Sequence, residues 1–195
     1  MKPAASSARP AVALRAFAPA DAEAALRVLL ADEDFAVAST GYLPAAGDLQ
    51  SLFYALPEGA SPDVKQILVA VADDEIVGVV DALLGWPASE TVTVGLFLIH
   101  PRCRRTGIGS RVLGMGVDRM RAGGFRQVRA GCPRGWEPGE RFLAGHGFAP
   151  AAAREPVAMN RVIHPHEAEH PAAAILRQII WCPRRAAPRG VEVWA

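Results

Sequence analysis

The chain has 195 residues, of which 51% are hydrophobic and 21% are charged. This length suits one domain with or without an appendage, and this composition excludes a chain that is disordered throughout. The formal net charge of +1 argues against a dedicated nucleic-acid-binding protein, so we expect no nucleic acid among its partners.

The three cysteines are irregularly spaced, which is not the pattern of a disulfide framework. His164, His166 and His170 do not have the spacing typical of a zinc site, so no metal is expected. Residues 1–10 lack the apolar segment of a signal peptide, and no apolar run is long enough to cross a membrane. The sequence therefore predicts a cytoplasmic protein without a membrane partner.

The first half of the chain predicts mainly strands. Residues 12–17 alternate as a strand does, and Asp21 can cap a helix that runs to Leu30. Residues 31–64 are ambiguous, apart from a short helix at 49–56. Three further strands are expected at 67–71, 76–84 and 92–99; the first two form a hairpin, and the third is apolar enough to be buried on both faces.

The second half predicts alternating helices and strands. A basic loop at 101–106 precedes a helix at 107–122, which Gly123 and Gly124 end. A strand at 127–132, a helix at 139–146 and a last core strand at 157–162 follow, and a helical stretch is expected at 172–181. This order predicts an α/β protein with a mixed sheet. Its expected parts are a flexible N-terminus (1–11), one domain (12–163) and a C-terminal extension (164–195).

The segment that indicates chemistry is 96–112, LFLIHPRCRRTGIGSRV. A buried strand leads into a loop with three arginines, and the loop opens a helix at Gly107 and Gly109. Glycines let a ligand approach the backbone, and the first turn of a helix presents unpaired N–H groups with a partial positive charge. Together with the arginines, these features predict a pyrophosphate-binding loop.

Two other phosphate-binding motifs fit this segment less well. A dinucleotide-binding motif requires a third glycine, but Val112 stands at that position, and the next strand ends in Gly131-Cys132-Pro133 without an acidic residue. A P-loop requires Gly-Lys followed by Ser or Thr, which the sequence lacks.

The same segment resembles the GNAT superfamily of N-acetyltransferases. The matching residues are 104–109 (RRTGIG), preceded by 98–101 (LIHP). Downstream, 142–148 (FLAGHGF) is similar to the family's helix that ends in Gly-Phe. Upstream, 78–81 (GVVD) and 85–87 (GWP) are similar to the hairpin of single-domain bacterial members. The resemblance covers residues 12–163.

The resemblance implies an acyl-CoA N-acyltransferase fold with a splayed pair of central strands. Acetyl-CoA would be the co-substrate, with its pantetheine arm between the strand that ends at Ile99 and the strand at 127–132. A backbone N–H near Leu98 would polarise the thioester oxygen, and a primary amine would attack directly. The residues expected to bind acetyl-CoA are Leu98, Ile99, His100, Arg104, Arg105, Thr106, Gly107, Ile108, Gly109 and Ser110.

The sequence departs from the family in the residues that move protons. Leu143 stands where many members have a tyrosine that protonates the leaving thiolate. Trp136 and Phe142 are expected to lie at the substrate pocket. Asp81 is the candidate base, because burial in its apolar strand would raise its pKa. A structural role for Asp81 stays open, as do Glu90, Glu137 or water as the base.

The predicted function is therefore transfer of the acetyl group of acetyl-CoA to a primary amine on a small molecule or a peptide. The missing tyrosine suggests the alternative, a non-catalytic acyl-CoA-binding or sensing module of the same fold. The apolar face expected in the extension would pack on the domain or across a homodimer.

Overall fold

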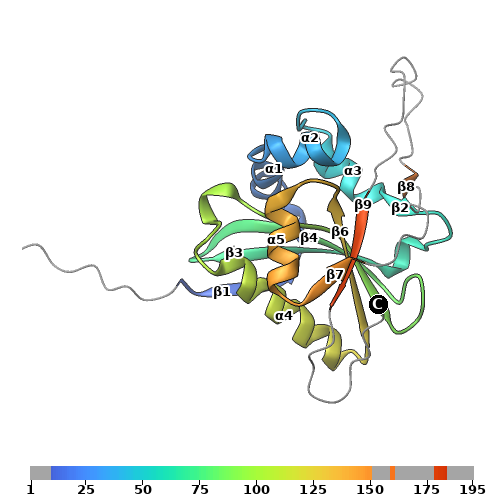
Figure 1. The fold of residues 1–195 in the computed structure, drawn as a ribbon. Helices are drawn as coiled ribbons and strands as arrows, with labels where there is room; N and C mark the ends of the chain where they lie inside the picture. The colour runs from blue at the N-terminus through green and yellow to red at the C-terminus, as the bar shows by residue number, and fades with distance from the viewer. Residues whose placement is uncertain (1–9, 151–158, 161–177, 184–195) are drawn as a thin grey trace, which may run out of the picture.

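A computed structural model describes residues 10–150, 159–160 and 178–183. These residues form a seven-stranded sheet in the order β1-β3-β4-β5-β6-β9-β7 and a separate two-stranded sheet (Figure 1). The strands of the large sheet are β1 (Val12–Ala16), β3 (Lys65–Ala72), β4 (Glu75–Leu84), β5 (Thr91–Ile99), β6 (Gln127–Pro133), β7 (Phe148–Pro150) and β9 (Gln178–Pro183). The small sheet pairs β2 (Leu56–Pro57) with β8 (Met159–Asn160).

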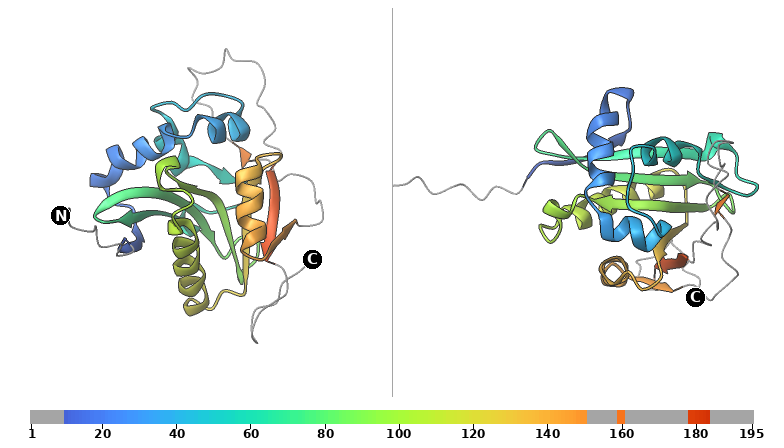
Figure 2. Two further views of the ribbon diagram at one scale, coloured as in Figure 1. Left: turned by 60° about the vertical axis from the view of Figure 1, so that its left-hand side comes forward. Right: turned by 90° about the horizontal axis from the view of Figure 1, so that it is seen from above.

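Helices cover both faces of the large sheet. They are α1 (Ala22–Leu30), α2 (Glu33–Thr40), α3 (Asp48–Tyr54), α4 (Ile108–Ala122) and α5 (Glu137–Gly145). Val79 of β4 packs in one apolar core with residues of α1 and α3, while its neighbour Val80 packs in a second core with residues of α4 and α5. Because side chains alternate along a strand, the two cores lie on opposite faces. Figures 1 and 2 show α4 and α5 on the same side of the sheet.

The order predicted from the sequence is confirmed from β1 to α5, with boundaries shifted by a few residues at several ends. Three elements, α2, β2 and β7, were not predicted. Asp21 does precede α1, but its carboxylate does not cap that helix. It accepts two hydrogen bonds from Arg15, at 2.6 and 2.9 Å, and one from the Ala18 N–H at 2.7 Å.

Two predictions in the C-terminal part are wrong. Met159–Asn160, expected within the last core strand, pairs instead with β2 outside the large sheet. Gln178–Trp181, expected to be helical, belongs to β9, which lies between β6 and β7. A short apolar run is compatible with either a helix or a buried strand, and here the unpaired side of β6 selects the strand. The rest of 151–195 lies outside the described residues.

The central strands β5 and β6 separate toward their C-terminal ends. They are parallel and paired from Thr91–Gln127 to Val94–Ala130, whereas both strands continue beyond that last pair. On the other side of β5, Asp81 pairs with Leu96 and Ala82 pairs with Val94, so Gly95 is an extra residue in a β-bulge. The gap therefore begins next to the bulge. The predicted splayed pair of strands is confirmed.

Candidate active site

The chain between β5 and α4 turns tightly through a short 3-10 turn, Pro101–Cys103, and two residues with positive φ. Arg105 has φ 64° and Gly107 has φ 84°. No side chain caps α4, and the Gly107 carbonyl accepts its bond from Arg111 N–H at 3.1 Å. The N–H groups of the first helical residues, 108–110, therefore have no partner within the helix. A Cβ on Gly107 would meet no atom within 4 Å, so the space beside this turn is open.

Arg104 is held inside the protein rather than offered to a ligand. Its Nε donates to the Ile99 carbonyl at 3.0 Å, and its guanidinium is paired with Asp32, the N-cap residue of α2. The guanidinium carbon lies 5.6 Å from the centre of the Trp136 ring, and the Arg104 N–H donates to the Pro101 carbonyl at 3.1 Å. Neither the side chain nor the N–H of Arg104 is thus available in the way that the sequence suggested.

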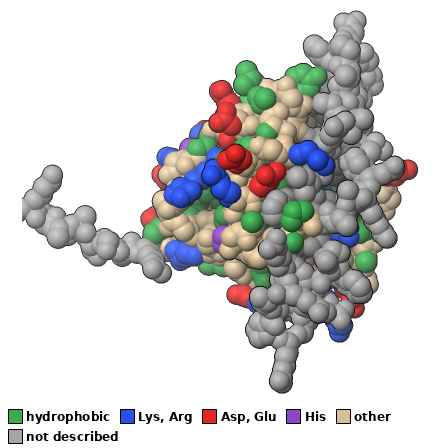
Figure 3. All heavy atoms as spheres, in the orientation of Figure 1, with side chains coloured by type: hydrophobic (Ala, Val, Ile, Leu, Met, Phe, Trp, Pro, Cys, Tyr) green, Lys and Arg blue, Asp and Glu red, His purple; other side chains and the backbone are tan. Residues whose placement is uncertain are grey.

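Positive charge at the turn comes from the other arginines and the helix N-terminus. Arg102 is exposed and pairs with Glu75 at 2.6 Å. Arg105 makes no ion pair among the described residues. Figure 3 shows cationic side chains gathered over the loop before α4, with acidic side chains beside them. An anion at this turn would meet Arg105 and the free N–H groups of α4.

His146, which the sequence analysis did not single out, reaches the first turn of α4 from the end of α5. Its Nε2 lies 2.9 Å from Ser110 Oγ, and its Nδ1 lies 2.8 Å from the Phe142 carbonyl. The imidazole therefore links the end of α5 to the first turn of α4. The motif FLAGHGF places His146 at the end of a helix, but the sequence does not show which other helix its side chain reaches.

The gap between β5 and β6 exposes backbone groups of alternate residues. His100 N–H donates to the Val77 carbonyl at 2.8 Å, so in an antiparallel ladder the N–H of Leu98 also points toward β4. The N–H and carbonyl groups of Phe97 and Ile99 then face the gap. The donor available to a ligand in the gap is therefore next to Leu98 in sequence, and His100 contributes no free backbone group, because its carbonyl accepts from Cys103 N–H at 2.8 Å.

Comparisons with known proteins agree with this geometry. The family described as "Acetyltransferase (GNAT) family" matches residues 29–148, more than half of the chain. The chain belongs to the GNAT family of acetyltransferases. Acyl transfer from coenzyme A is the reaction of this family, and acetyl-CoA is its co-substrate. No curated protein matches the chain.

Solved structures share the GNAT fold. An acetyltransferase from Thermus thermophilus has 24% identity and a TM-score of 0.59, covering 89% of this chain and 96% of that one. The PaiA N-acetyltransferase from Thermoplasma acidophilum, solved in complex with coenzyme A, has 14% identity and a TM-score of 0.59, with coverages of 89% and 99%. An N-acetyltransferase from Staphylococcus aureus has 20% identity and a TM-score of 0.55, with coverages of 73% and 86%. Within the described part of the chain, no helix is long and apolar enough to span a membrane.

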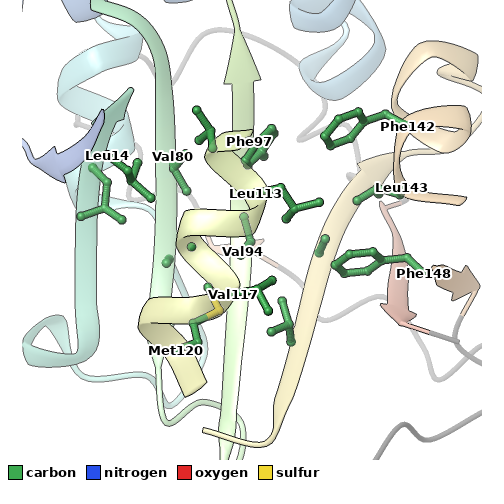
Figure 4. A pocket seen from close by; sticks show the side chains of 16 residues that line it. Leu14, Val80, Val94, Phe97, Leu113, Val117, Met120, Phe142, Leu143 and Phe148 are labelled. Atoms are coloured by element: carbon green, nitrogen blue, oxygen red, sulfur yellow. The ribbon is translucent and has the colours of Figure 1, made fainter. Parts of the chain in front are cut away.

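In this GNAT protein Leu143, which the resemblance places at the position of the family's tyrosine, lies in the apolar core. Leu143 is 6% exposed and lines a cavity of about 40 Å³ between α4, α5 and the sheet (Figure 4). Phe142, on the same helix, stacks on Phe97 with ring centroids 5.5 Å apart. Its ring lies 3.3 Å from where a Cβ on Gly109 would be, so it supports the first turn of α4. Neither residue can supply a proton.

Trp136, expected at the substrate pocket, packs against residues of α2 and of the loop before α4. It is the N-cap residue of α5, in the turn that follows β6, and its ring packs edge-on against Phe35 of α2 with centroids 5.0 Å apart. The guanidinium of Arg104 lies over the face of the same ring. A cluster of four side chains therefore joins α2 to the segments that follow both splayed strands: Trp136, Phe35, Arg104 and Asp32.

Asp81 lies at the start of the gap, on the α1–α3 face of the sheet. Its cross-strand neighbours Ile67 and Leu96 belong to the core on that face. Asp81 is 3% exposed, and burial raises the pKa of its carboxyl group, partly offset by Lys65. His100 is held by its own loop, because its Nδ1 accepts from Arg102 N–H at 3.2 Å, and burial is the main cause that lowers its pKa.

Proposed function

We propose that this GNAT protein transfers the acetyl group of acetyl-CoA to a primary amine by direct attack. The observation that supports this most is the coincidence of two features: an open, uncapped N-terminus of α4 and a gap between β5 and β6 that starts at a bulge. The helix N-terminus suits a pyrophosphate, and the gap between the strands suits an extended arm with amide groups. Acetyl-CoA has both, joined in one molecule.

The pyrophosphate would bind to residues of the turn and of the first helical turn, with Arg105 adding charge. These residues are Arg105, Thr106, Gly107, Ile108, Gly109 and Ser110. The pantetheine arm would pair with the N–H and carbonyl of Phe97 and with the N–H of Ile99, whose carbonyl already accepts from Arg104 Nε. A thioester oxygen near the start of the gap could accept a hydrogen bond from the Phe97 N–H, which would stabilise negative charge on that oxygen during attack.

Asp81 is the proposed general base. The acceptor arrives as an ammonium ion, gives one proton to the carboxylate, and its nitrogen then attacks the thioester carbon. The carbon–sulfur bond breaks, the sulfur leaves as a thiolate, and the second proton of the nitrogen reaches the thiolate through water, since Leu143 cannot carry it. Small molecules and peptides both remain acceptors, and the cytoplasmic location and homodimer stay predictions.

Ligand-dependent stability tests the cofactor. Acetyl-CoA and coenzyme A should each raise the melting temperature, with a stabilisation of about 2.7 kcal/mol at a concentration 100 times the Kd, because they bind only the folded state. NAD, which also has a pyrophosphate but no pantetheine arm, should not. Equal shifts with NAD and acetyl-CoA, or none with either, would contradict the proposed cofactor.

Thiol release tests the reaction and distinguishes an enzyme from a non-catalytic acyl-CoA-binding module. The module is the second candidate, because the apolar surroundings of Leu143 offer no acid for the leaving thiolate. Coenzyme A release from acetyl-CoA would be measured with spermidine, an aminoglycoside, lysine methyl ester and a peptide with a free N-terminus. An enzyme should release thiol with at least one amine above the rate without amine. Stabilisation by acetyl-CoA without release for any amine in the panel would favour the module.

A further inference from the structure

Asp81 is paired with a second buried charge, Lys65 on β3. The Lys65 Nζ lies 2.9 Å from Asp81 Oδ2, and the two side chains are only 6% and 4% exposed. The same Nζ donates to the Ala55 carbonyl at 2.7 Å, directly after α3. The ammonium therefore ties one oxygen of the carboxylate to the end of a helix on the α1–α3 face.

The other oxygen of this carboxylate is left without a partner. Asp81 Oδ1 is buried and accepts no hydrogen bond from the described residues. A buried acceptor without a donor loses its hydrogen bonds to water, so such atoms are rare in folded proteins unless a ligand or water completes them.

The position of the pair connects it to the gap. Asp81 Oδ2 lies 3.2 Å from where a Cβ on Gly95 would be, and Gly95 is the bulge residue next to the last paired residues of β5 and β6. A side chain at position 95 would press on the carboxylate. The pair therefore lies where the strands begin to separate, on the face opposite α4.

We propose that Lys65 is a positioning residue: it holds Oδ2 of Asp81 against the end of α3 and leaves Oδ1 free to take the proton of the acceptor amine. This inference rests on the proposed role of Asp81 as the base. Lys65 itself touches neither substrate. Its three N–H donors make it suited to the task, because two are used by Asp81 and Ala55 and neither bond involves Oδ1.

Lys65 also affects how readily Asp81 is ionised. Burial disfavours the carboxylate, and the nearby ammonium favours it. The groups on β5 that face the carboxylate, Gly95 and Leu96, are uncharged, and α1 and α3 pack against this face through apolar residues. Among the described residues, Lys65 is the charged group that acts on Asp81. Without it, the carboxylate would hold its proton to a higher pH.

The pH dependence of the rate tests the proposal. Using the fastest amine of the panel, Lys65→Met should lower kcat at pH 7 by about tenfold or more, and should move the midpoint of the acidic limb to higher pH. Lys65→Arg, which keeps the charge and its donors, should restore most of the rate. Arg15→Met is the matched control: it removes the partner of another buried aspartate, Asp21, away from the gap, and should leave the pH profile unchanged.

A double-mutant cycle separates positioning from stability. If Lys65 acts through Asp81, adding Lys65→Met to Asp81→Asn should change kcat little further, because the base is already lost. That double variant removes both charges of the Lys65–Asp81 pair, so it should fold even if Lys65→Met alone does not. A multiplicative loss of kcat in the cycle, or a Lys65→Met profile with an unmoved midpoint, overturns the role of Lys65.

The pH–rate profiles of Asp81→Asn and Lys65→Met show whether Asp81 or only Lys65 lacks the proposed role. If Asp81→Asn keeps the wild-type pH profile, Asp81 is not the base and the proposal for Lys65 falls with it. If Asp81→Asn alters the profile while Lys65→Met does not, only Lys65 is excluded. Titration of the Asp81 carboxyl by NMR in protein labelled with ¹³C-aspartate gives an independent reading, and an unchanged midpoint in Lys65→Met would also exclude Lys65.

Discussion

Gly107 and Gly124 stand before and after α4 in the same left-handed conformation, with φ values of 84° and 82°. A Cβ on either would meet no atom within 4 Å. A non-glycine residue costs about 1–2 kcal/mol in this conformation, so the two sites carry similar backbone costs. They differ in what they face, because only Gly107 adjoins the free N–H groups at the start of α4.

This pair makes a controlled test of the phosphate site. Gly107→Glu should weaken acetyl-CoA binding by tenfold or more, because a carboxylate would enter the space beside the helix N-terminus and repel the pyrophosphate. Gly124→Glu should show the same loss of stability with unchanged binding. The measurements are calorimetric Kd and melting temperature. Equal Kd values for the two folded variants would show that the turn before α4 does not bind the phosphates.

Gly109 is a poorer place for the same test. Its backbone is helical, but a Cβ there would lie 3.3 Å from the Phe142 ring, so Gly109→Glu would move a ring that packs on Phe97. A change in binding by this variant would mix charge with displaced packing. The sequence presented the two glycines as equivalent, and only the structure separates them.

Asp81 gives a second prediction at the residue scale. Asp81→Asn should lower kcat most at pH values above the pKa of Asp81, where the wild-type carboxylate is ionised and can accept a proton, and least below it. Burial raises that pKa, so the difference between variant and wild type should appear at higher pH than for an exposed aspartate. The check is a pH–rate profile of kcat, with the Kd of acetyl-CoA expected to stay nearly unchanged.

At the scale of elements, α5 determines why the usual tyrosine cannot simply be restored. Leu143 faces a cavity lined by apolar residues, and it packs between α4 and the sheet. The hydroxyl of a tyrosine there would have no polar neighbour in the lining. Burial of an unpaired hydroxyl costs about 1–3 kcal/mol.

Leu143→Tyr should therefore lower stability by about 1–3 kcal/mol, because its hydroxyl would be buried without a partner, and should not raise kcat. Denaturant unfolding and thiol release measure the two effects. Leu143→Met is the matched control, because it conserves volume without a hydroxyl and should cost less than about 1.5 kcal/mol. A faster and equally stable Leu143→Tyr enzyme would show that this side chain reaches the leaving thiolate after all.

At the scale of the whole molecule, β9 joins distant parts of the chain. It pairs with β6 from Ala130 to Pro133 on one edge and with β7 from Phe148 to Pro150 on the other. Figure 1 shows β9 beside the splayed strand β6. The strand that borders the gap is therefore supported from its far side by residues close to the end of the sequence.

Removal of β9 should thus affect the domain itself. A chain ending at residue 177 should unfold at a lower temperature and bind acetyl-CoA more weakly, because β6 would lose its outer neighbour and β7 its partner in the sheet. A chain ending at residue 183 keeps β9 and serves as the control. If both truncated chains match the full chain in melting temperature and Kd, β9 does not support the site.

The sequence by itself determined most of the first 150 residues and the family. Periodic apolar residues and glycine turns locate the strands and helices from β1 to α5, because these signals act over a few neighbouring residues. The turn before α4 was predicted for the same reason: a strand, arginines, two glycines and a helix start are contiguous in the chain, and each has a local physical meaning.

Only the tertiary structure decided which charged and backbone groups at that site have partners within the protein and which stay available to a ligand. The sequence cannot show that Asp32 takes Arg104, that Lys65 takes one oxygen of Asp81, or that β9 rather than the segment around Met159 lies beside β6. These outcomes depend on contacts between residues 16 to 72 positions apart, or on the pairing of a short run that could be helix or strand. Local propensity carries no information on such pairings, because the partner that satisfies a buried charge or an unpaired strand is chosen by the packing of the whole fold.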